Sequence, residues 1–195
     1  MTASVRARER SRDPRSDETL VRTCNRGGPG AAAAFDALYR RHKDYVLRVA
    51  LRFAPDMDTA LDVLQETFLQ LLRKFPPSGD GIELTARLTT LLYPIARNAA
   101  IDARRRAARL PVDADVTPDD LAAAPEPDTH DLGELLAGLP DHQREVLTLR
   151  FVDGLTLDEV AQTLAIPLGT VKSRLHLGVA RLRASPALKD YFAIE

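Results

Sequence analysis

The chain of 195 residues and 21.5 kDa has room for one medium-sized domain or two small ones, each with a buried core. Its composition is globular, with 45% hydrophobic and 28% charged residues and a formal net charge of −1. The single cysteine, Cys24, excludes an internal disulfide, and no cysteine or histidine falls into metal-ligand spacing. No apolar run approaches the roughly 18 residues of a membrane span, so we expect a cytoplasmic protein with no membrane insertion, no metal and no other cofactor.

The small net charge conceals an uneven distribution along the chain. Residues 1–34 carry +3, residues 35–110 carry +4, residues 111–134 carry −8 and residues 135–195 carry zero. The third segment holds eight carboxylates, four prolines and no cation, and such a segment cannot bury enough apolar surface to fold. We therefore predict two domains on a flexible acidic linker: a disordered head over 1–15, a helical domain over 16–110, the linker over 111–134, a second domain over 135–184 and a tail over 185–195.

The first domain is predicted to begin with a short helix capped by Ser16, with Asp17 and Glu18 in the first turn, where the helix dipole favours acidic side chains. After the glycine-rich break at 27–30, apolar residues recur at steps of three and four and predict a helix that ends at Pro55. They are Phe35, Leu38, Tyr39, Tyr45, Val46, Val49 and Phe53.

Two more helices complete the predicted domain, separated by a loop at 76–82 that is rich in proline and glycine. The first runs to about Phe75, and the second from about Glu83 to Arg109, with Pro94 predicting a kink or short break near Leu92. The residues predicted to point inward are Leu61, Leu64, Phe68 and Leu72 in the first, and Leu84, Leu88, Leu91 and Ile95 in the second. No convincing strand pattern occurs, so the fold class is all-α.

The second domain is predicted to contain a helix-turn-helix. A helix from Pro140 to Val152 comes first, and Thr156 then begins a capping box with Glu159. A short helix to about Leu164, a three-residue turn and a longer helix over 168–183 follow, which is the spacing of a helix-turn-helix. The longer helix holds no acidic residue and offers polar and basic groups suited to the major groove. They are Thr170, Lys172, Ser173, Arg174 and His176.

These segments resemble the extracytoplasmic-function sigma factors, the smallest promoter-recognition subunits of bacterial RNA polymerase. Residues 139–147 and 169–176 resemble the family's C-terminal domain, which binds the minus-35 promoter element. Residues 35–39, 62–68 and 95–102 resemble its N-terminal domain, which binds core polymerase and the minus-ten element. The resemblance extends over about 17–110 and 135–184, in the family's order and spacing.

The resemblance implies a role for each group of polar residues. Asp62, Gln65 and Glu66 would bind core polymerase, and the five polar residues of the longer helix would bind duplex minus-35 DNA. The 76–82 loop and the end of the third helix would hold the separated minus-ten strand. The residues of that helix are Arg97, Asn98, Asp102, Arg104, Arg105 and Arg109. The linker would pass through a basic channel of the polymerase, although a solvated spacer predicts the same composition.

Two other functions remain open at this point. A free-standing helix-turn-helix repressor or activator would use the same C-terminal residues, and a sigma mimic would sequester a regulator without opening DNA. Leu91 and Pro94 depart from the family pattern at the strand-opening surface, and Leu61 departs from it in the polymerase-binding helix. The family also leaves an anti-sigma factor open as a further partner. We expect no enzyme activity, because the chain has no nucleophile elbow, no phosphate-binding loop and no zinc-protease motif.

Overall fold

The computed structural model describes residues 13–108, 136 and 138–184. Arg109 and the predicted linker and tail lie outside the described residues. Every regular element within the described ranges is helical, which confirms the all-α prediction. The chain divides into two compact units between Ala124 and Pro125, and each unit is described below by itself.

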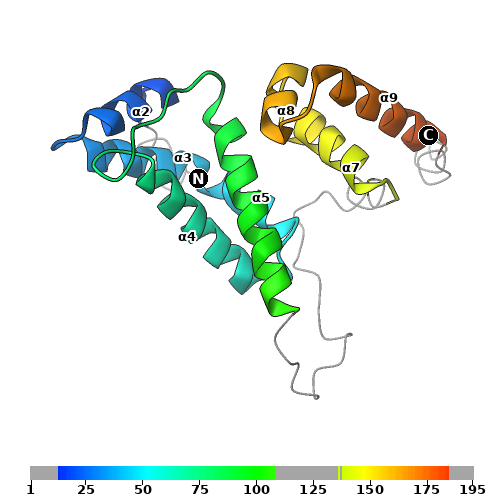
Figure 1. Cartoon of the computed structure of the whole chain (residues 1–195), viewed down its shortest axis with the longest axis horizontal. Helices are drawn as coiled ribbons and strands as arrows, with labels where there is room; N and C mark the ends of the chain where they lie inside the picture. The colour runs from blue at the N-terminus through cyan, green and yellow to red at the C-terminus, as the bar shows by residue number, and fades with distance from the viewer. Residues whose placement is uncertain (1–12, 109–135, 137, 185–195) are drawn as a thin grey trace, which may run out of the picture. The chain divides into compact units, whose positions relative to one another are not determined.

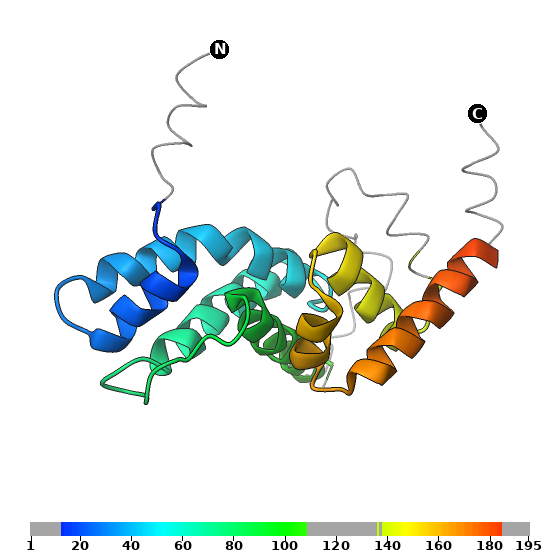
Figure 2. The ribbon, with the colours of Figure 1, turned by 90° about the horizontal axis from the view of Figure 1, so that it is seen from above.

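The first unit is built from four helices: α2 (Asp17–Arg26), α3 (Ala31–Leu51), α4 (Met57–Arg73) and α5 (Leu88–Ala107). Figures 1 and 2 show α2 folded back along α3 as a hairpin, with α4 and α5 packed beside α3. The predicted Ser16 cap is confirmed, since the Ser16 hydroxyl accepts a hydrogen bond from the Thr19 N–H at 3.3 Å. Fully buried side chains from all four helices form the core, among them Leu20, Leu38, Val46, Leu71 and Leu92.

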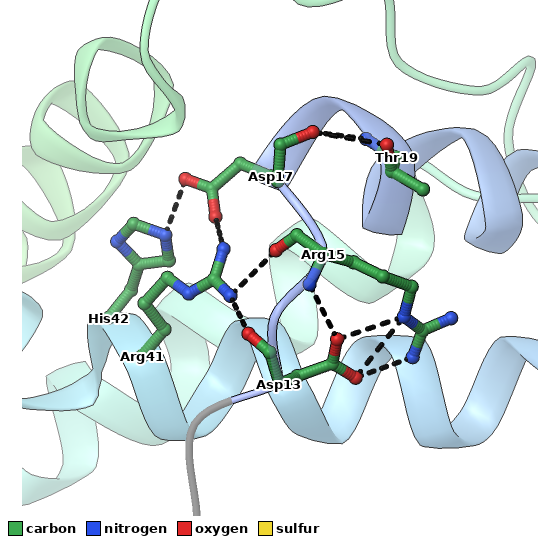
Figure 3. Close-up of polar contacts among 7 residues, drawn as sticks. Asp13, Arg15, Asp17, Thr19, Arg41 and His42 are labelled. Carbon is green, nitrogen blue, oxygen red and sulfur yellow. Dashed lines mark hydrogen bonds and ion pairs between the residues drawn. The ribbon is translucent and has the colours of Figure 1, made fainter. Parts of the chain in front are cut away.

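The chain ahead of α2 is held against α3, although we predicted a disordered head as far as Arg15. The Arg41 guanidinium donates to the backbone carbonyls of Asp13 and Arg15, at 2.7 and 2.8 Å, and to the Asp17 carboxylate at 2.5 Å. Figure 3 shows these bonds together with the contact between Asp17 and His42. The described chain therefore begins at Asp13 with contacts that no periodicity in the sequence indicates.

The inward face of α4 differs from the prediction. Leu61 and Leu72, which we expected in the core, are 40% and 48% exposed. The buried residues of the helix are Ala60, Val63, Leu64, Thr67, Phe68 and Leu71. The physical reason is that leucines occur around most of the helix circumference, and packing against α3 and α5 selects which of them are covered.

The predicted third helix begins five residues late and packs on a different face. Residues 83–87 are not helical, and α5 starts at Leu88 and continues through Pro94 to Ala107 as one helix, without the break expected near Leu92. Leu84, Leu91 and Ile95 are only partly buried. The core residues of α5 are Leu88, Leu92, Tyr93, Ala96 and Ala100.

The second unit consists of α7 (Asp141–Leu147), a π-helical turn η2 (Thr148–Val152), α8 (Leu157–Leu164) and α9 (Leu168–Ala184). The single helix predicted over 140–152 is thus an α-helix that widens in its last turn, where the Asp153 N–H bonds to the Thr148 carbonyl at 3.0 Å. Gly178 lets α9 approach α7, because a Cβ at this position would lie 2.8 Å from Cδ1 of Leu147. Leu136, Leu139 and Leu147 form a buried cluster against the inner side of α9.

Candidate nucleic-acid and polymerase interfaces

The turn between α8 and α9 has a defined geometry that fixes how the second helix is presented. The predicted capping box is confirmed: the Thr156 hydroxyl accepts from the Glu159 N–H at 3.2 Å, and the Glu159 carboxylate accepts from the Thr156 N–H at 2.8 Å. At the other end of α8, Ala165 adopts a left-handed conformation with a φ of 52°, and the Ile166 N–H bonds to the Ala161 carbonyl at 3.1 Å. The predicted helix-turn-helix is confirmed as α8, a turn over 165–167 and α9.

The polar residues predicted on α9 lie on its outer side. Lys172, Ser173 and His176 are exposed, and Thr170 and Arg174 are partly buried. Val171 is fully buried and anchors the first turns of α9 on the opposite side. The first three turns of the helix therefore present hydrogen-bond donors and positive charge to solvent, as a major-groove helix requires.

One basic residue of α9 has a structural contact. The Arg181 guanidinium donates to the Gln143 side-chain oxygen at 3.0 Å, and Gln143 is 2% exposed on α7. A buried amide oxygen would carry a desolvation cost without this partner. Arg181 thus helps to hold α9 against α7, whereas Lys172 and Arg174 lie nearer the start of the helix.

The predicted core-binding residues lie on the outer side of α4, and we call Asp62, Gln65 and Glu66 the polar α4 face. Asp62 and Gln65 are exposed, and Glu66 is partly buried. The Glu66 carboxylate accepts from the Gln70 amide at 3.0 Å and from the Arg73 guanidinium at 3.4 Å. This face is acidic at Asp62 and partly neutralised at Glu66.

Three exposed leucines of α4, which we call the apolar stripe, are interleaved with the polar α4 face and are missing from the sequence-based site. They are Leu61, Leu69 and Leu72, which are 40%, 47% and 48% exposed. Exposed leucines that share one side of a helix with charged side chains are typical of protein interfaces. The available signal in the sequence was the presence of more leucines in α4 than one inward face can hold.

Four of the six residues predicted at the end of α5 are exposed. They are Asn98, Asp102, Arg104 and Arg105. The Arg105 guanidinium lies 3.7 Å from the Asp102 carboxylate, one helical turn away. The Arg97 guanidinium is partly buried and stacks over the Phe53 ring at 5.5 Å. Arg109, the sixth predicted residue, lies beyond the part of the chain that the structure describes.

The 76–82 loop projects from the end of α4 and folds back on it. The N–H groups of Ser78 and Gly79 both donate to the Phe75 carbonyl, at 3.1 and 3.0 Å, and the Gly81 N–H donates to the Lys74 carbonyl at 2.9 Å. The side chains of Pro76, Pro77, Ser78 and Asp80 are exposed. The loop therefore has a folded base and an exposed tip.

Neither a membrane-spanning helix nor a metal site is found within the described residues. No helix there is long and apolar enough to cross a membrane. In the same ranges, no group of three or more histidine, cysteine or acidic side chains is placed to hold a metal ion.

Comparison with known proteins assigns both units to one family. The Sigma-70 region 2 family matches residues 38–110, and the Sigma-70, region 4 family matches residues 135–184. The chain is 37% identical over 169 residues to the ECF RNA polymerase sigma factor SigL of Mycobacterium tuberculosis, covering 79% of this chain and 92% of SigL. It is 31% identical over 179 residues to SigE of Mycolicibacterium smegmatis, covering 86% of this chain and 65% of SigE.

Solved structures share the fold. The structure of CnrH in complex with the cytosolic domain of CnrY matches with a TM-score of 0.61 and 25% identity, covering 86% of this chain and 95% of that chain. The sigma factor RpoE of Bartonella quintana, in complex with the anti-sigma factor NepR, matches with a TM-score of 0.58 and 24% identity, covering 80% and 96%. The chain belongs to the extracytoplasmic-function sigma factors, which bind core RNA polymerase and direct it to specific promoters.

Proposed function

We propose that this sigma factor uses three separate surfaces to bind minus-35 DNA, core polymerase and the minus-ten strand. The outer side of α9 reads or clamps duplex minus-35 DNA through Thr170, Lys172, Ser173, Arg174 and His176. The polar α4 face binds core polymerase. The 76–82 loop, together with Arg97, Asn98, Asp102, Arg104, Arg105 and Arg109, holds the separated minus-ten strand.

The geometry of the second unit carries this proposal furthest. The capping box and the Ala165 turn fix α8 and α9 in the arrangement of a DNA-binding helix-turn-helix, and Lys172, Ser173 and His176 of α9 are exposed to solvent. A helix without a single acidic residue avoids repulsion from the phosphates on either side of the groove. A helix that served the fold alone would not need to exclude acidic residues.

The two surfaces of the first unit are supported by exposure and by chemistry. The polar α4 face offers charged and polar side chains, and the apolar stripe on the same side of the helix offers exposed leucines, and protein interfaces combine both. Arg104 and Arg105 are free of the hydrophobic core and are available for phosphate contacts. Strand opening would then be driven by capture of unstacked bases, which must offset a cost of a few kcal/mol for each base.

The proposed domain limits follow from the same assignment. Residues 16–110 form the core-binding and minus-ten-binding domain, 111–134 the linker, 135–184 the minus-35-binding domain and 185–195 the tail. The family initiates transcription without catalysis of its own, and we assign no catalytic residue. We place its action in the cytoplasm, where RNA polymerase meets DNA.

A protein regulator is a further proposed partner. CnrH, which this chain resembles, was solved bound to the cytosolic domain of CnrY. A regulator that covered the apolar stripe of α4 would remove Leu61, Leu69 and Leu72 from water and would compete with core polymerase for the same face.

Transcription from a random promoter library tests the proposed function directly. Purified chain and core polymerase are incubated with the library, and the initiated transcripts are sequenced. The proposal predicts one promoter class with two defined elements upstream of the start site. Random initiation, at the level of core polymerase alone, would contradict it.

A further inference from the structure

The side chain of Asn25 binds the backbone of a residue 57 positions later. In the last turn of α2, its Nδ2–H donates to the Ile82 carbonyl at 2.8 Å, and its Oδ1 accepts from the Ile82 N–H at 2.9 Å. The amide thus satisfies both backbone groups of one residue, as a neighbouring strand would. Asn25 thereby ties α2 to the end of the 76–82 loop.

The backbone next to Ile82 is shaped around this amide. Gly81 has a φ of 96°, which side chains other than glycine rarely allow. A Cβ at Gly81 would also lie 2.9 Å from Oδ1 of Asn25, so any side chain there would require the amide to shift from its present position. The contact therefore depends on the residue type at both positions.

The loop is also held to the end of α4 by bonds of its own backbone. The Gly81 N–H bonds to the Lys74 carbonyl, and the Gly79 N–H bonds to the Phe75 carbonyl, at 2.9 and 3.0 Å. Gly79 has no room for a Cβ, which would contact the backbone oxygens of Arg73 and Lys74. The loop is thus pinned to α4 at its base and to α2 at Ile82, while Pro76, Pro77, Ser78 and Asp80 stay exposed.

We infer that Asn25 is a positioning residue for strand opening, because it holds the 76–82 loop in the conformation that receives an unstacked minus-ten base. This inference rests on the proposed function of that loop. A loop ordered before DNA arrives does not lose conformational freedom when it captures the base, so capture is tighter. Neither α2 nor Asn25 is part of the three surfaces proposed above.

The asparagine amide meets both requirements of the contact, because it donates one hydrogen bond and accepts the other. Alanine removes both hydrogen bonds. Aspartate keeps the size and the acceptor but has no hydrogen to donate, and its charge faces the Ile82 carbonyl oxygen. We expect both variants to bind a single-stranded minus-ten segment about 5- to 30-fold more weakly, the change that corresponds to one or two hydrogen bonds.

The test uses the full chain in complex with core polymerase. The DNA is a fork carrying the promoter selected from the library, with a single-stranded non-template minus-ten segment. A second DNA carries only the duplex minus-35 element. The variants are Asn25→Ala and Asn25→Asp. The control is Arg22→Ala, an exposed residue of the same helix whose guanidinium pairs with Glu18 on α2 itself. A photoreactive benzophenone side chain in place of Ser78 reports whether the loop reaches the minus-ten strand.

The inference predicts that the Asn25 variants lose fork binding and the cross-link from position 78, while their affinity for core polymerase and for the minus-35 duplex equals that of the parent. Equal fork binding by the parent and both variants would overturn it. A proportional loss of core, duplex and fork binding would also overturn it, because it would assign Asn25 a role in folding alone. If the parent itself gives no cross-link to the minus-ten strand, the proposed function of the loop fails and the inference fails with it.

Discussion

His42 and Asp17 join the middle of α3 to the first turn of α2, with Nε2 of the histidine 2.8 Å from Oδ2 of the carboxylate. The second oxygen of Asp17 accepts a bond from the Arg41 guanidinium. Burial alone would raise the pKa of Asp17, but the bonds from His42 and Arg41 outweigh it and hold that pKa below its ordinary value of 3.8. The ionised form of Asp17 therefore stabilises the contact between α2 and α3.

This contact predicts a stability difference that depends on pH. A carboxylate whose pKa is lower in the folded chain contributes stability above its unfolded pKa and loses it as the pH falls through the folded value. Asp17→Asn should lower the free energy of unfolding by about 1 to 3 kcal/mol near neutral pH. The difference from the parent should shrink once the pH falls below about 4. Urea unfolding followed by tyrosine fluorescence measures it, since Tyr39, Tyr45 and Tyr93 lie in the first unit.

Glu18→Gln is the matched control for this measurement. Glu18 lies beside Asp17 in the same turn but pairs only with Arg22 in the described contacts, and its side chain is 70% exposed. An exposed pair of this kind contributes well under about 1 kcal/mol. A difference between Asp17→Asn and the parent that stays constant from neutral pH to pH 3 would contradict the assignment.

Ala165 predicts a stabilising substitution in the helix-turn-helix. Its left-handed conformation costs a residue with a Cβ roughly 1 kcal/mol relative to glycine. Ala165→Gly should therefore raise the protection of α8 and α9 amides in hydrogen exchange. Ala180→Gly, at an exposed position inside α9, should lower the stability by about 1 kcal/mol because glycine is a poor helix former. Hydrogen exchange measures both variants. A loss of amide protection in Ala165→Gly, equal to the loss in Ala180→Gly or larger, would contradict the strain assigned to Ala165.

The helical units and their caps could be predicted from sequence because their determinants are local. The Ser16 cap and the Thr156–Glu159 capping box each lie within four residues, and both occur as predicted. The inward face of α4 could not be predicted, since Leu61 and Leu72 fit the helical period as well as Val63 and Leu71 do. Which set is buried depends on the packing of α3 and α5.

The start of α5 illustrates the same limit over a longer distance. The apolar pattern of 83–109 continues through Leu84, and local sequence alone favoured an earlier helix. The chain instead stays non-helical to Arg87, and Ile82 bonds to Asn25 on α2. A contact across 57 residues leaves no periodic signal, and for the same reason Asn25 was absent from the sequence-based site.

The polar α4 face predicts a loss of polymerase binding without a loss of fold. The triple variant Asp62→Ala, Gln65→Ala and Glu66→Ala should bind core polymerase at least about tenfold more weakly. A tenfold loss corresponds to about 1.4 kcal/mol, a size that charged contacts across an interface reach in total. Thermal unfolding should change little, because the three side chains lie outside the core. Competition with a labelled sigma factor measures the affinity. Asp44→Ala, an exposed acidic residue on α3, is the control, and unaltered affinity of the triple variant would contradict the assignment.

The polar residues of α9 predict two different effects of alanine substitution. Loss of a side chain that reads a base should cost about 1 to 3 kcal/mol and relax the preference at one promoter position. Loss of a phosphate contact should weaken all promoters alike and reduce the salt dependence. Promoter profiles of Lys172→Ala, Ser173→Ala, Arg174→Ala and His176→Ala separate the two roles. Arg183→Ala, in the exposed last turn of α9, is the control. If all four variants gave the promoter profile of the parent, the assignment of α9 to the major groove would be contradicted.

The comparison of the chain alone with the chain bound to core polymerase tests the central claim most directly. A single neutral DNA-binding domain makes few phosphate contacts, so the chain alone should bind the selected promoter weakly and lose binding steeply with salt. With core polymerase, both DNA-binding surfaces act together, and the minus-ten bases should become reactive to a single-strand probe. A tight footprint from the chain alone at physiological salt, with no strand opening after core polymerase is added, would contradict the account and favour a free-standing repressor or activator.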